Sequence, residues 1–479
     1  MIYDVVIIGA GVVGAMLARN LSRYQLRVCL LEKENDVAMG ASKANSGIIH
    51  GGYDPEPGTM KALLNTRGVE PLFRAAEELD VPCRRNGSMV CAFSPEEEAT
   101  LEQLYRRGQE NGTSNLKILT GEEARKLEKR LSKAVTKVLH VPNAGIISPY
   151  ELTVAAAGNA MDNGVDLYRN FCVTGICREE VFTVTAATGE EVQSRFLVNC
   201  AGGYADGIAK LVGDDFFTLI PRAGEYLLLD KNQGEQVGHT LFPCPTKNGK
   251  GILISPTVHG NLLLGPTATV VTAPDSCDTT EEGLAQVAKL AGKTVPSVDL
   301  RQVITSFTGV RASVKTGDFI LEASRRIPGL VHAAAIDSPG LTCSVSIAEA
   351  LTAILAREGL SLRHKDKWNG RRVSPCRFRE LTEEEKNIWI QKDPAYGRVV
   401  CRCEQVTEGE IRDAIRQNPP ALDMDSIKRR TRSGMGRCQG GFCGPYVMQL
   451  LSRERQIPME QVTKSGMGSY MVTERIGKL

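Results

Sequence analysis

The chain has 479 residues, too many for one ordinary domain, and at roughly 150 residues per domain this length predicts about three. Hydrophobic residues make up 42% of the chain and charged residues 24%, which is typical of a globular protein with a large core. The net charge of +2 provides no overall field that would attract nucleic acid, an anionic membrane or an acidic partner.

The first residues, Met1 to Asp4, lack the basic leader and the small-residue cleavage site of a secretory signal. The longest uncharged apolar-rich stretch, Val5 to Ala18, is interrupted by glycines and is shorter than the ~20 residues that span a bilayer. We therefore expect a cytoplasmic protein without a membrane span, whose contact with a membrane would come through a partner.

The chain begins with the pattern of a βαβ unit. Residues 3–8 form a short apolar run that predicts a buried parallel strand, the apolar spacing over 12–24 predicts a helix, and Leu26–Glu32 predicts a second strand. Gly9-Ala10-Gly11-Val12-Val13-Gly14 lies between the first strand and the helix, where glycines let the backbone approach a pyrophosphate. Glu32 is placed to accept both ribose hydroxyls, which favours FAD or NAD over NADP. A glycine turn that serves packing alone is the alternative.

Further along, residues 70–135 are charged and helix-like, and 150–165 predict a helix that ends at Asn163-Gly164. Asn248-Gly249 and Gly260-Asn261 are typical hairpin turns. Apolar or alternating runs predict a mostly antiparallel central sheet, with strands at Phe182–Ala186, Arg195–Cys200, Glu225–Asp230, Gly251–Ser255 and Leu262–Gly265. After these we expect a strand over 330–336, a helix over 346–357, a linker or surface wrap over 361–397, and a compact module over 398–455.

Several motifs in this order carry a family resemblance. The small and hydroxyl residues of 40–47 can wrap a second phosphate and lie along a flavin, which favours FAD over NAD. The other motifs are Asn45-Ser46-Gly47-Ile48-Ile49-His50-Gly51-Gly52, Asn199-Cys200-Ala201-Gly202, Pro221-Arg222-Ala223-Gly224-Glu225-Tyr226, Thr308-Gly309-Val310-Arg311 and Ile336-Asp337-Ser338-Pro339-Gly340-Leu341-Thr342. With them the chain resembles the D-amino-acid-oxidase-like flavoproteins from residue 3 to about 357. Within that superfamily it is most similar to glycerol-3-phosphate and L-2-hydroxyglutarate dehydrogenases.

The resemblance implies an α/β fold in which an FAD-binding Rossmann-like domain is interleaved with a β-rich substrate domain, followed by a small helical iron–sulfur module. The expected boundaries are 1–80, 140–220 and 325–360 for the FAD-binding domain, 81–139 and 221–324 for the substrate domain, 361–397 for a linker, 398–460 for the module and 461–479 for a tail. The FAD-binding residues that it implies are Gly9, Gly11, Gly14, Glu32, Lys33, Ala41, Ser42, Asn45, Ser46, Gly47, Val173, Ala201, Gly202, Ser338, Gly340, Leu341 and Thr342.

Four of the fourteen cysteines form two close pairs near the end of the chain, Cys401-x-Cys403 and Cys438-x4-Cys443. In a reducing cytosol such pairs indicate a metal rather than disulfides, and thiolates suit zinc or an iron–sulfur cluster. A C-x-C pair is tighter than the usual zinc knuckle. The segment resembles the bacterioferritin-associated-ferredoxin-type domain, which implies a 2Fe–2S cluster; the spacing between the cysteines departs from that pattern, and zinc or no metal are the alternatives.

Four residues are candidates for the reaction itself, and a fifth, Lys61, is considered only for binding an anion. Arg311 stands where the family places an arginine over the flavin, and its guanidinium could clamp a phosphate or carboxylate. His50 could take the substrate's hydroxyl proton, or could be a flavin-pocket histidine without that role. Arg222 and Tyr226 match the family's substrate-sheet motif, with an ion pair across the sheet as the alternative for Arg222. Lys61 could help to bind an anion, although a helix-surface lysine is the simpler expectation.

The other polar features receive structural interpretations. His140, His239, His259, His332 and His364 have no partner pattern, and we expect structural roles for them. The run Lys428-Arg429-Arg430 with Arg432 is expected to be a solvated face, with docking of an acidic partner as the alternative.

From the resemblance we expect an FAD-dependent dehydrogenase that oxidises sn-glycerol 3-phosphate, a small anionic substrate, to dihydroxyacetone phosphate. A flavin beside a 2Fe–2S centre converts two-electron into one-electron transfer, so we expect output to protein electron-acceptor subunits or a quinone pathway. The alternatives are oxidation of L-2-hydroxyglutarate or another 2-hydroxy acid, oxidation of an amine or imino acid, and a non-catalytic electron-transfer or assembly subunit.

Overall fold

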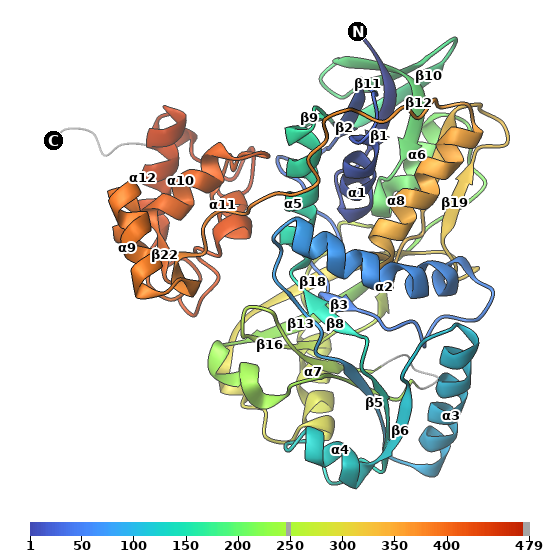
Figure 1. Cartoon of the computed structure of the whole chain (residues 1–479), viewed down its shortest axis with the longest axis vertical. Helices are drawn as coiled ribbons and strands as arrows, with labels where there is room; N and C mark the ends of the chain where they lie inside the picture. The colour runs from blue at the N-terminus through green and yellow to red at the C-terminus, as the bar shows by residue number, and fades with distance from the viewer. Residues whose placement is uncertain (246–250, 473–479) are drawn as a thin grey trace.

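The computed structural model describes residues 1–245 and 251–472. It contains two large sheets with their helices and a separate helical module at the C-terminal end, which lies beside α5 of the first sheet's domain (Figure 1). The predicted hairpin turn Asn248-Gly249 and residues 473–479 of the predicted tail lie outside the described residues.

The first sheet has eight strands and a parallel centre. Its order is β10-β11-β12-β1-β2-β9, with β20 pairing β12 and β19 pairing β20, and β9, β2, β1, β12 and β20 run parallel. The predicted first βαβ unit is confirmed at this centre. The strands are β1 (Ile2–Ile8), β2 (Val28–Leu31), β9 (Asp166–Tyr168), β10 (Val173–Arg178), β11 (Phe182–Ala186), β12 (Glu191–Asn199), β19 (Ile320–Ala323) and β20 (Leu330–Ala334).

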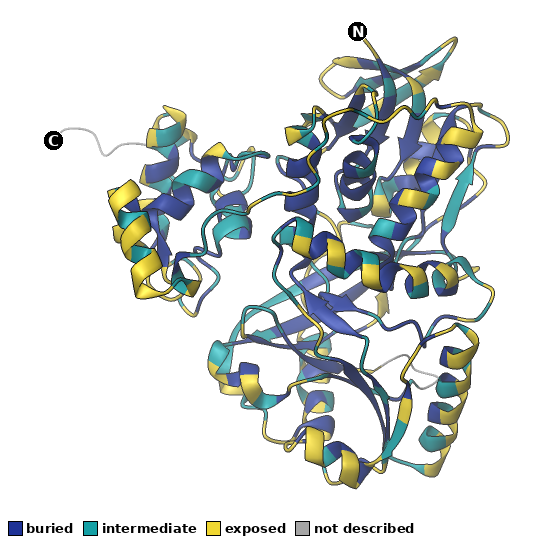
Figure 2. Cartoon of the chain, viewed as in Figure 1, coloured by how far each residue is buried: buried dark blue, intermediate teal, exposed yellow. Residues whose placement is uncertain are grey.

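Helices cover this sheet because its strands are apolar on both faces. Their bounds are α1 (Val12–Leu21), α2 (Met60–Glu78), α5 (Pro149–Asp162), α6 (Ala205–Leu211) and α8 (Gly340–Arg357). α1 packs against both α5 and α8, and the strands and helices share one large core, visible as the dark region of Figure 2. By length and composition alone α8 could cross a membrane, but most of it is buried against α1 and α2, as expected for a core helix.

The second sheet has nine strands in the order β17-β13-β16-β15-β14-β5-β7-β6, with β18 paired to β13. Its helices are α3 (Pro95–Glu110), α4 (Gly121–Leu127) and α7 (Glu281–Thr294); α4 and α7 share one core and α3 packs in another. The predicted turn Gly260-Asn261 is confirmed between β15 and β16. The strands are β5 (Ser88–Ala92), β6 (Lys117–Thr120), β7 (Lys137–Val141), β13 (Ile220–Leu229), β14 (Thr240–Pro243), β15 (Leu253–Pro256), β16 (Leu262–Gly265), β17 (Thr269–Val270) and β18 (Val303–Ser313).

A small sheet joins the two large ones. Its order is β3-β8-β4, with β3 (Ile48–Ile49), β8 (Gly145–Ile147) and β4 (Cys83–Arg84), and it lies between the two large sheets in Figure 1. The expectation that 70–135 is helical is wrong in part, because β4, β5 and β6 interrupt that region. Charged helical segments flank the five-residue β5 in the sequence, which makes its strand pattern hard to recognise. In the structure β5 is entirely buried and pairs with β7 and β14.

The segment after α8 has two parts, and only the first is extended. Residues 361–377 run along the first domain, where the Arg363 carbonyl accepts from Gln25 N at 2.7 Å and Arg372 N donates to the Glu78 carbonyl at 2.9 Å. Residues 378–397, expected to belong to a linker, instead contain α9 (Glu383–Lys392) with a Thr382–Glu385 capping box. The capping box satisfies the first N–H groups of α9 and lets this short polar helix form.

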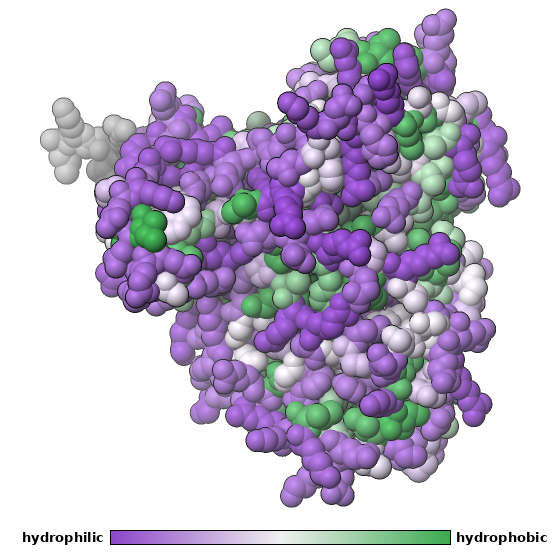
Figure 3. All heavy atoms as spheres, viewed as in Figure 1, coloured by the Kyte–Doolittle hydropathy of each residue, from purple (hydrophilic) through white to green (hydrophobic). Residues whose placement is uncertain are grey.

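The C-terminal module is built around its own small core. Its elements are β21 (Val399–Cys401), β22 (Val406–Thr407), α10 (Glu408–Arg416), α11 (Met424–Thr431) and α12 (Gly444–Arg455). Val462, from the segment expected to be a tail, is fully buried in that core. The module's outer surface is mostly hydrophilic on the face shown in Figure 3, and its apolar side chains pack mainly in its core.

Candidate active site

The turn between β1 and α1 has space only for glycine. Gly9 has φ +105°, and a Cβ on it would lie 2.4 Å from the Cys200 carbonyl oxygen. A Cβ on Gly14 would lie 2.0 Å from the Gly9 carbonyl oxygen. Because side chains are excluded, a phosphate group can approach the backbone at the start of α1, as the predicted motif requires.

Glu32 directly follows β2 and is almost completely buried beside this turn. Its Oε2 accepts from Ala10 N at 2.8 Å and its Oε1 from Glu34 N at 3.0 Å. Burial raises the pKa of this carboxyl, while the two backbone N–H groups act against the rise. The carboxylate therefore lies where a ribose diol would meet it, and the residues of this turn fit an adenine dinucleotide.

The segment 41–47 folds back onto the same turn. Ser42 Oγ accepts from Val12 N, the first N–H of α1, at 2.9 Å. Asn45 closes the segment on itself, since its Nδ2 donates to the Ala41 carbonyl at 2.9 Å and its Oδ1 accepts from Gly47 N at 2.8 Å. Ser46 lies within hydrogen-bond reach of Tyr226 on the second sheet. These predicted residues thus form one surface between the α1 N-terminus and the second sheet.

The remaining predicted cofactor residues lie around the carboxyl edge of the parallel strands. Lys33 Nζ lies 4.1 Å from the centre of the Tyr204 ring, and Ala201 N donates to Asn199 Oδ1 at 3.3 Å after β12. Gly202 has φ +57°, and Val173 opens β10 two residues after Phe171, whose N donates to the Glu32 carbonyl at 2.8 Å. Ser338, Gly340, Leu341 and Thr342 follow β20 at the start of α8.

Arg222 and Arg311 lie directly opposite each other on the antiparallel pair β13 and β18. Directly opposite residues of such a pair project to the same face, so the two side chains share one face of the sheet. Arg311 lies over Gly224, where a Cβ would come within 2.3 Å of its Nη2, and it donates to the Thr267 carbonyl at 2.7 Å. Within residues 1–245 and 251–472, neither guanidinium has a carboxylate partner.

An aromatic pair continues that face. Tyr226 is buried and stacks on Phe307, its cross-strand partner, with ring centres 4.8 Å apart. Burial raises the pKa of the Tyr226 phenol. A Cβ on Gly309, between Phe307 and Arg311, would lie 1.8 Å from the Ala44 carbonyl oxygen, so this face lies against the cofactor segment 41–47. Sequence reasoning missed Phe307, although its alternation with Gly309 and Arg311 is a period-two signal.

His50 lies at the junction of β3 with the start of α8. Its backbone N donates to Thr342 Oγ1 at 2.9 Å, and its ring Nε2 lies 3.2 Å from Ser338 Oγ. The ring lines a cavity of about 20 Å³ together with Tyr53 and Phe242. The structure thus joins His50 to the predicted cofactor residues Ser338 and Thr342.

Lys61 is not the helix-surface lysine that we expected. Its side chain is only 14% exposed, and its Nζ pairs with Asp337 Oδ1 at 2.5 Å, next to Ser338. The same amino group lies 5.4 Å from the centre of the Phe319 ring. Lys61 therefore fixes the turn before α8, a role that the sequence spacing did not indicate.

The four cysteines come together across the sequence pairs. Cys403 Sγ lies 3.6 Å from Cys438 Sγ, and the Cys401 thiol is hydrogen-bonded to that of Cys443. Backbone N–H groups of Phe442, Gly440 and Gly441 donate toward the Cys438 thiol and lower its pKa. Among the described residues no three His, Cys, Asp or Glu side chains form a preformed metal site. Four soft donors surrounded by backbone N–H groups nevertheless fit an iron–sulfur cluster.

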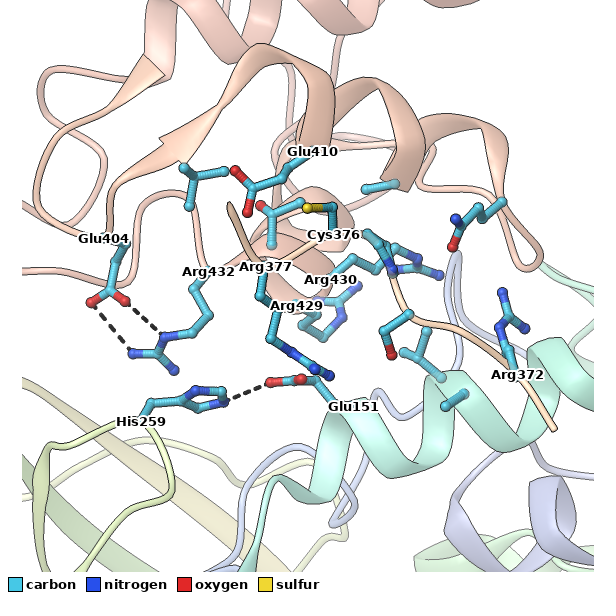
Figure 4. A pocket seen from close by; sticks show the side chains of 18 of the residues that line it. Glu151, His259, Arg372, Cys376, Arg377, Glu404, Glu410, Arg429, Arg430 and Arg432 are labelled. Carbon is cyan, nitrogen blue, oxygen red and sulfur yellow. Dashed lines mark hydrogen bonds and ion pairs between the residues drawn. The ribbon is translucent and has the colours of Figure 1, made fainter. Parts of the chain in front are cut away.

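The basic run 428–432, expected to be a solvated face, is instead the contact between the module and the first domain. Arg429 and Arg430 are buried and pair with Asp36 at 2.6 and 2.8 Å. Arg432 pairs with Glu404 at 2.9 Å, and His259, expected to be structural, pairs with Glu151 at 2.7 Å in the same junction (Figure 4). The expectation was wrong because the run is buried against Asp36, a carboxylate that is nearly four hundred residues away in the sequence.

Comparisons with known proteins agree with this geometry. Residues 4–354 match the family model described as FAD dependent oxidoreductase. The chain belongs to this FAD-dependent oxidoreductase family. Residues 399–453 match the BFD-like [2Fe-2S] binding domain, so FAD and a 2Fe–2S cluster are the cofactors. The expected fold class, the two cofactors and the oxidoreductase class are thereby confirmed, and zinc is not supported.

Several relatives are named for glycerol 3-phosphate, and others are named for a 2-hydroxy acid, such as the mitochondrial L-2-hydroxyglutarate dehydrogenase of Homo sapiens, 26% identical over 72% of this chain and 87% of its own length. A glycerol 3-phosphate dehydrogenase of Caloramator mitchellensis is 42% identical over 471 residues, covering 98% of each chain. A glycerol 3-phosphate oxidase of Mycoplasma pneumoniae is 33% identical over 77% of this chain and 97% of its own length. The structure of dithionite-reduced L-alpha-glycerophosphate oxidase from that organism, with FAD bound, superposes with a TM-score of 0.75 at 31% identity over 78% of this chain and all of its own.

Proposed function

We propose that this oxidoreductase converts sn-glycerol 3-phosphate to dihydroxyacetone phosphate. The observation that carries the proposal is the cross-strand pair Arg222 and Arg311, because two cations on one face of the sheet without a carboxylate partner among the described residues suit an anionic ligand. A phosphate matches the fork of a guanidinium. The names of the relatives from Caloramator and Mycoplasma support the same substrate.

The residues around the pair suggest how the substrate is handled. When bound, FAD supplies the acceptor for the hydride lost from the substrate carbon. Arg311, held by the Thr267 carbonyl, binds and orients the phosphate. The stacked rings of Tyr226 and Phe307 exclude water beside it. His50 removes the hydroxyl proton through its imidazole, and the Ser338 hydroxyl orients that ring.

We also propose that the electrons leave through the iron–sulfur module. Cys401, Cys403, Cys438 and Cys443 would hold the 2Fe–2S cluster, which would supply one-electron transfer after the two-electron oxidation of the alcohol. Cys403 is exposed, and Phe442, whose backbone N–H donates to Cys438, is 81% exposed. A thiol edge open to solvent beside an unburied aromatic ring suits delivery to a one-electron acceptor, a protein subunit or a quinone pathway.

Anaerobic reduction of the purified holoenzyme tests the substrate. We expect sn-glycerol 3-phosphate to bleach the flavin absorbance in single turnover, and glycerol, which lacks the phosphate, to do so far more slowly. L-2-Hydroxyglutarate in a parallel sample tests the carboxylate alternative. Faster bleaching by that hydroxy acid contradicts the proposed substrate, and bleaching by neither compound contradicts oxidation of a 2-hydroxy anion altogether.

A further inference from the structure

Tyr150, at the start of α5, contacts the loop that leads to the second cysteine pair. Arg432 Nη1 donates to Tyr150 Oη at 3.1 Å, and Tyr150 Oη donates to Met435 Sδ at 3.5 Å. Burial raises the pKa of this phenol, so its proton remains available for the contact with sulfur. Tyr150 is therefore the meeting point between α5 and the 432–438 loop.

On the flavoprotein side, Tyr150 follows a proline that packs against the cofactor segment. A Cβ on Gly47 would lie 3.4 Å from Pro149 Cδ and 2.5 Å from the Ile147 carbonyl oxygen. Ile147 N also donates to the Gly47 carbonyl at 2.8 Å. The end of segment 41–47, which folds onto the α1 N-terminus, is thus hydrogen-bonded to Ile147, two residues before the start of α5.

On the module side, Met435 leads directly to a cysteine. A Cβ on the next residue, Gly436, would lie 2.4 Å from Cys403 Cβ, so the backbone there lies against that side chain. Cys403 in turn contacts Cys438. Hydrogen bonds, close approaches and short stretches of chain therefore connect the cofactor segment with the cluster ligands through Gly47, Ile147, Tyr150, Met435, Gly436 and Cys403.

Arg432 holds this series in place. Its Nε donates to Glu404 Oε2 at 2.9 Å, beside Cys403, and its Nη2 donates to Asn261 Oδ1 at 3.2 Å on the substrate sheet. Figure 4 shows Arg432 paired with Glu404 at the base of the module. One buried guanidinium thereby joins α5, the substrate sheet and both cysteine loops.

We propose that Tyr150 and Met435 are positioning residues that form the route by which electrons pass from the flavin to the Cys403 edge of the cluster. The inference rests on the proposed electron exit through the module. Oxidation of one alcohol to a ketone releases two electrons and two protons; the electrons cross one at a time, each to a one-electron acceptor outside, and the protons pass to solvent. Neither side chain is oxidised, because each only supplies closely packed atoms across the domain boundary.

Stopped-flow spectroscopy of the anaerobic holoenzyme tests the route, with the flavin and cluster bands followed separately. Tyr150→Phe removes the hydroxyl that joins Arg432 and Met435, and Met435→Ala opens a gap in the series. We expect both variants to slow cluster reduction severalfold, while flavin reduction and the cluster midpoint potential stay at wild-type values. The matched controls, Tyr446→Phe on the module surface and Met467→Ala, are expected to leave every rate unchanged.

Photoreduction of the flavin replaces the substrate in a second set of samples, so the route is tested even if sn-glycerol 3-phosphate is the wrong substrate. Wild-type rates of cluster reduction in both Tyr150→Phe and Met435→Ala overturn the route but leave the proposed function standing. A wild-type cluster that stays oxidised while the flavin is reduced overturns both the route and the exit through the module. A shifted cluster potential shows that the side chain acts on the cluster itself, which also overturns the route.

Discussion

Arg222 and Arg311 show how a residue pair acquires a role from strand register rather than from sequence spacing. Eighty-nine positions separate them, yet β13 and β18 place them opposite each other. In the described part of the chain no carboxylate pairs with either arginine. An anionic ligand is therefore the counterion that we expect for these two side chains.

Replacing Arg311 tests that interpretation. Arg311→Ala is expected to raise KM for sn-glycerol 3-phosphate about 10- to 100-fold, because hydrogen bonds to charged groups contribute about 1.5–3 kcal/mol. Steady-state kinetics with an artificial one-electron acceptor measures it. Arg301→Ala, at a highly exposed arginine of the same domain, is the control and should not alter KM. An unchanged KM in Arg311→Ala would remove this residue from the substrate site.

Replacement of His50 is expected to have a different kinetic effect from replacement of an anion-binding residue. His50→Asn keeps a polar side chain near Ser338 but cannot act as the proton acceptor, so kcat should fall about 100- to 10,000-fold with little change in KM. Single-turnover flavin reduction measures the chemical step directly. FAD content, read from the absorbance ratio, must remain at the wild-type level. A kcat within a few-fold of wild type means that the imidazole has no role in proton transfer.

At the level of single elements, the β1–α1 turn gives the sharpest test. Gly9→Ala forces a side chain into a left-handed position and against the Cys200 carbonyl, so we expect protein that purifies with little or no flavin absorbance. Gly207→Ala, within α6 and with open space around it, should keep its flavin and gain up to about 1 kcal/mol of stability. Full FAD content in Gly9→Ala would contradict the placement of the dinucleotide at this turn.

Elements with strong local signals were predictable from sequence. The β-branched run of β1 and the glycine turn each combine a residue preference with a position, and the structure confirms both. β5 was missed because five buried residues between charged helices carry too little periodic pattern. α9 was missed because polarity suggested a linker, although its Thr382–Glu385 capping box was visible in the sequence.

For the site residues, too, predictability from the sequence depended on whether the signal was local. Ser42, Asn45 and Thr342 were predictable because a family motif places them in contiguous segments. Asp36 and Tyr150 were not, because each acquires its role only when the module docks on the first domain. Partners that are distant in sequence and joined by side-chain geometry leave no local pattern to find.

At the scale of the whole molecule, Asp36 anchors the module. Asp36→Asn leaves two buried arginines without their carboxylate, and removal of one partner of a buried ion pair costs about 3–5 kcal/mol. We expect faster amide hydrogen exchange in α11, measured by mass spectrometry, with the β1 and α1 amides unchanged. Asp215→Asn, at an exposed ion pair, should leave α11 protected. Unchanged exchange in α11 would contradict the anchoring role.

The same anchor predicts a direction for pH dependence. Burial acts to raise the pKa of the Asp36 carboxyl, but the charges of Arg430 and Arg429 outweigh it and hold the pKa well below the ordinary value of about 3.9. The stabilisation is therefore complete above that ordinary value and is lost as pH falls through the lower folded-state pKa. Protection of α11 should decline in acid below about pH 4 and not near neutrality; in Asp36→Asn this acid dependence should be weaker.

Asp36 lies in the same short loop as Glu32, which faces the dinucleotide turn. Binding of the dinucleotide beside Glu32 and docking of the module on Asp36 both order this loop. Because the two equilibria are linked, we expect each to favour the other. A chain stripped of its flavin should consequently lose iron more readily, and a chain that never acquired iron should retain its flavin less tightly. We therefore expect incorporation of the two prosthetic groups to be coupled rather than independent.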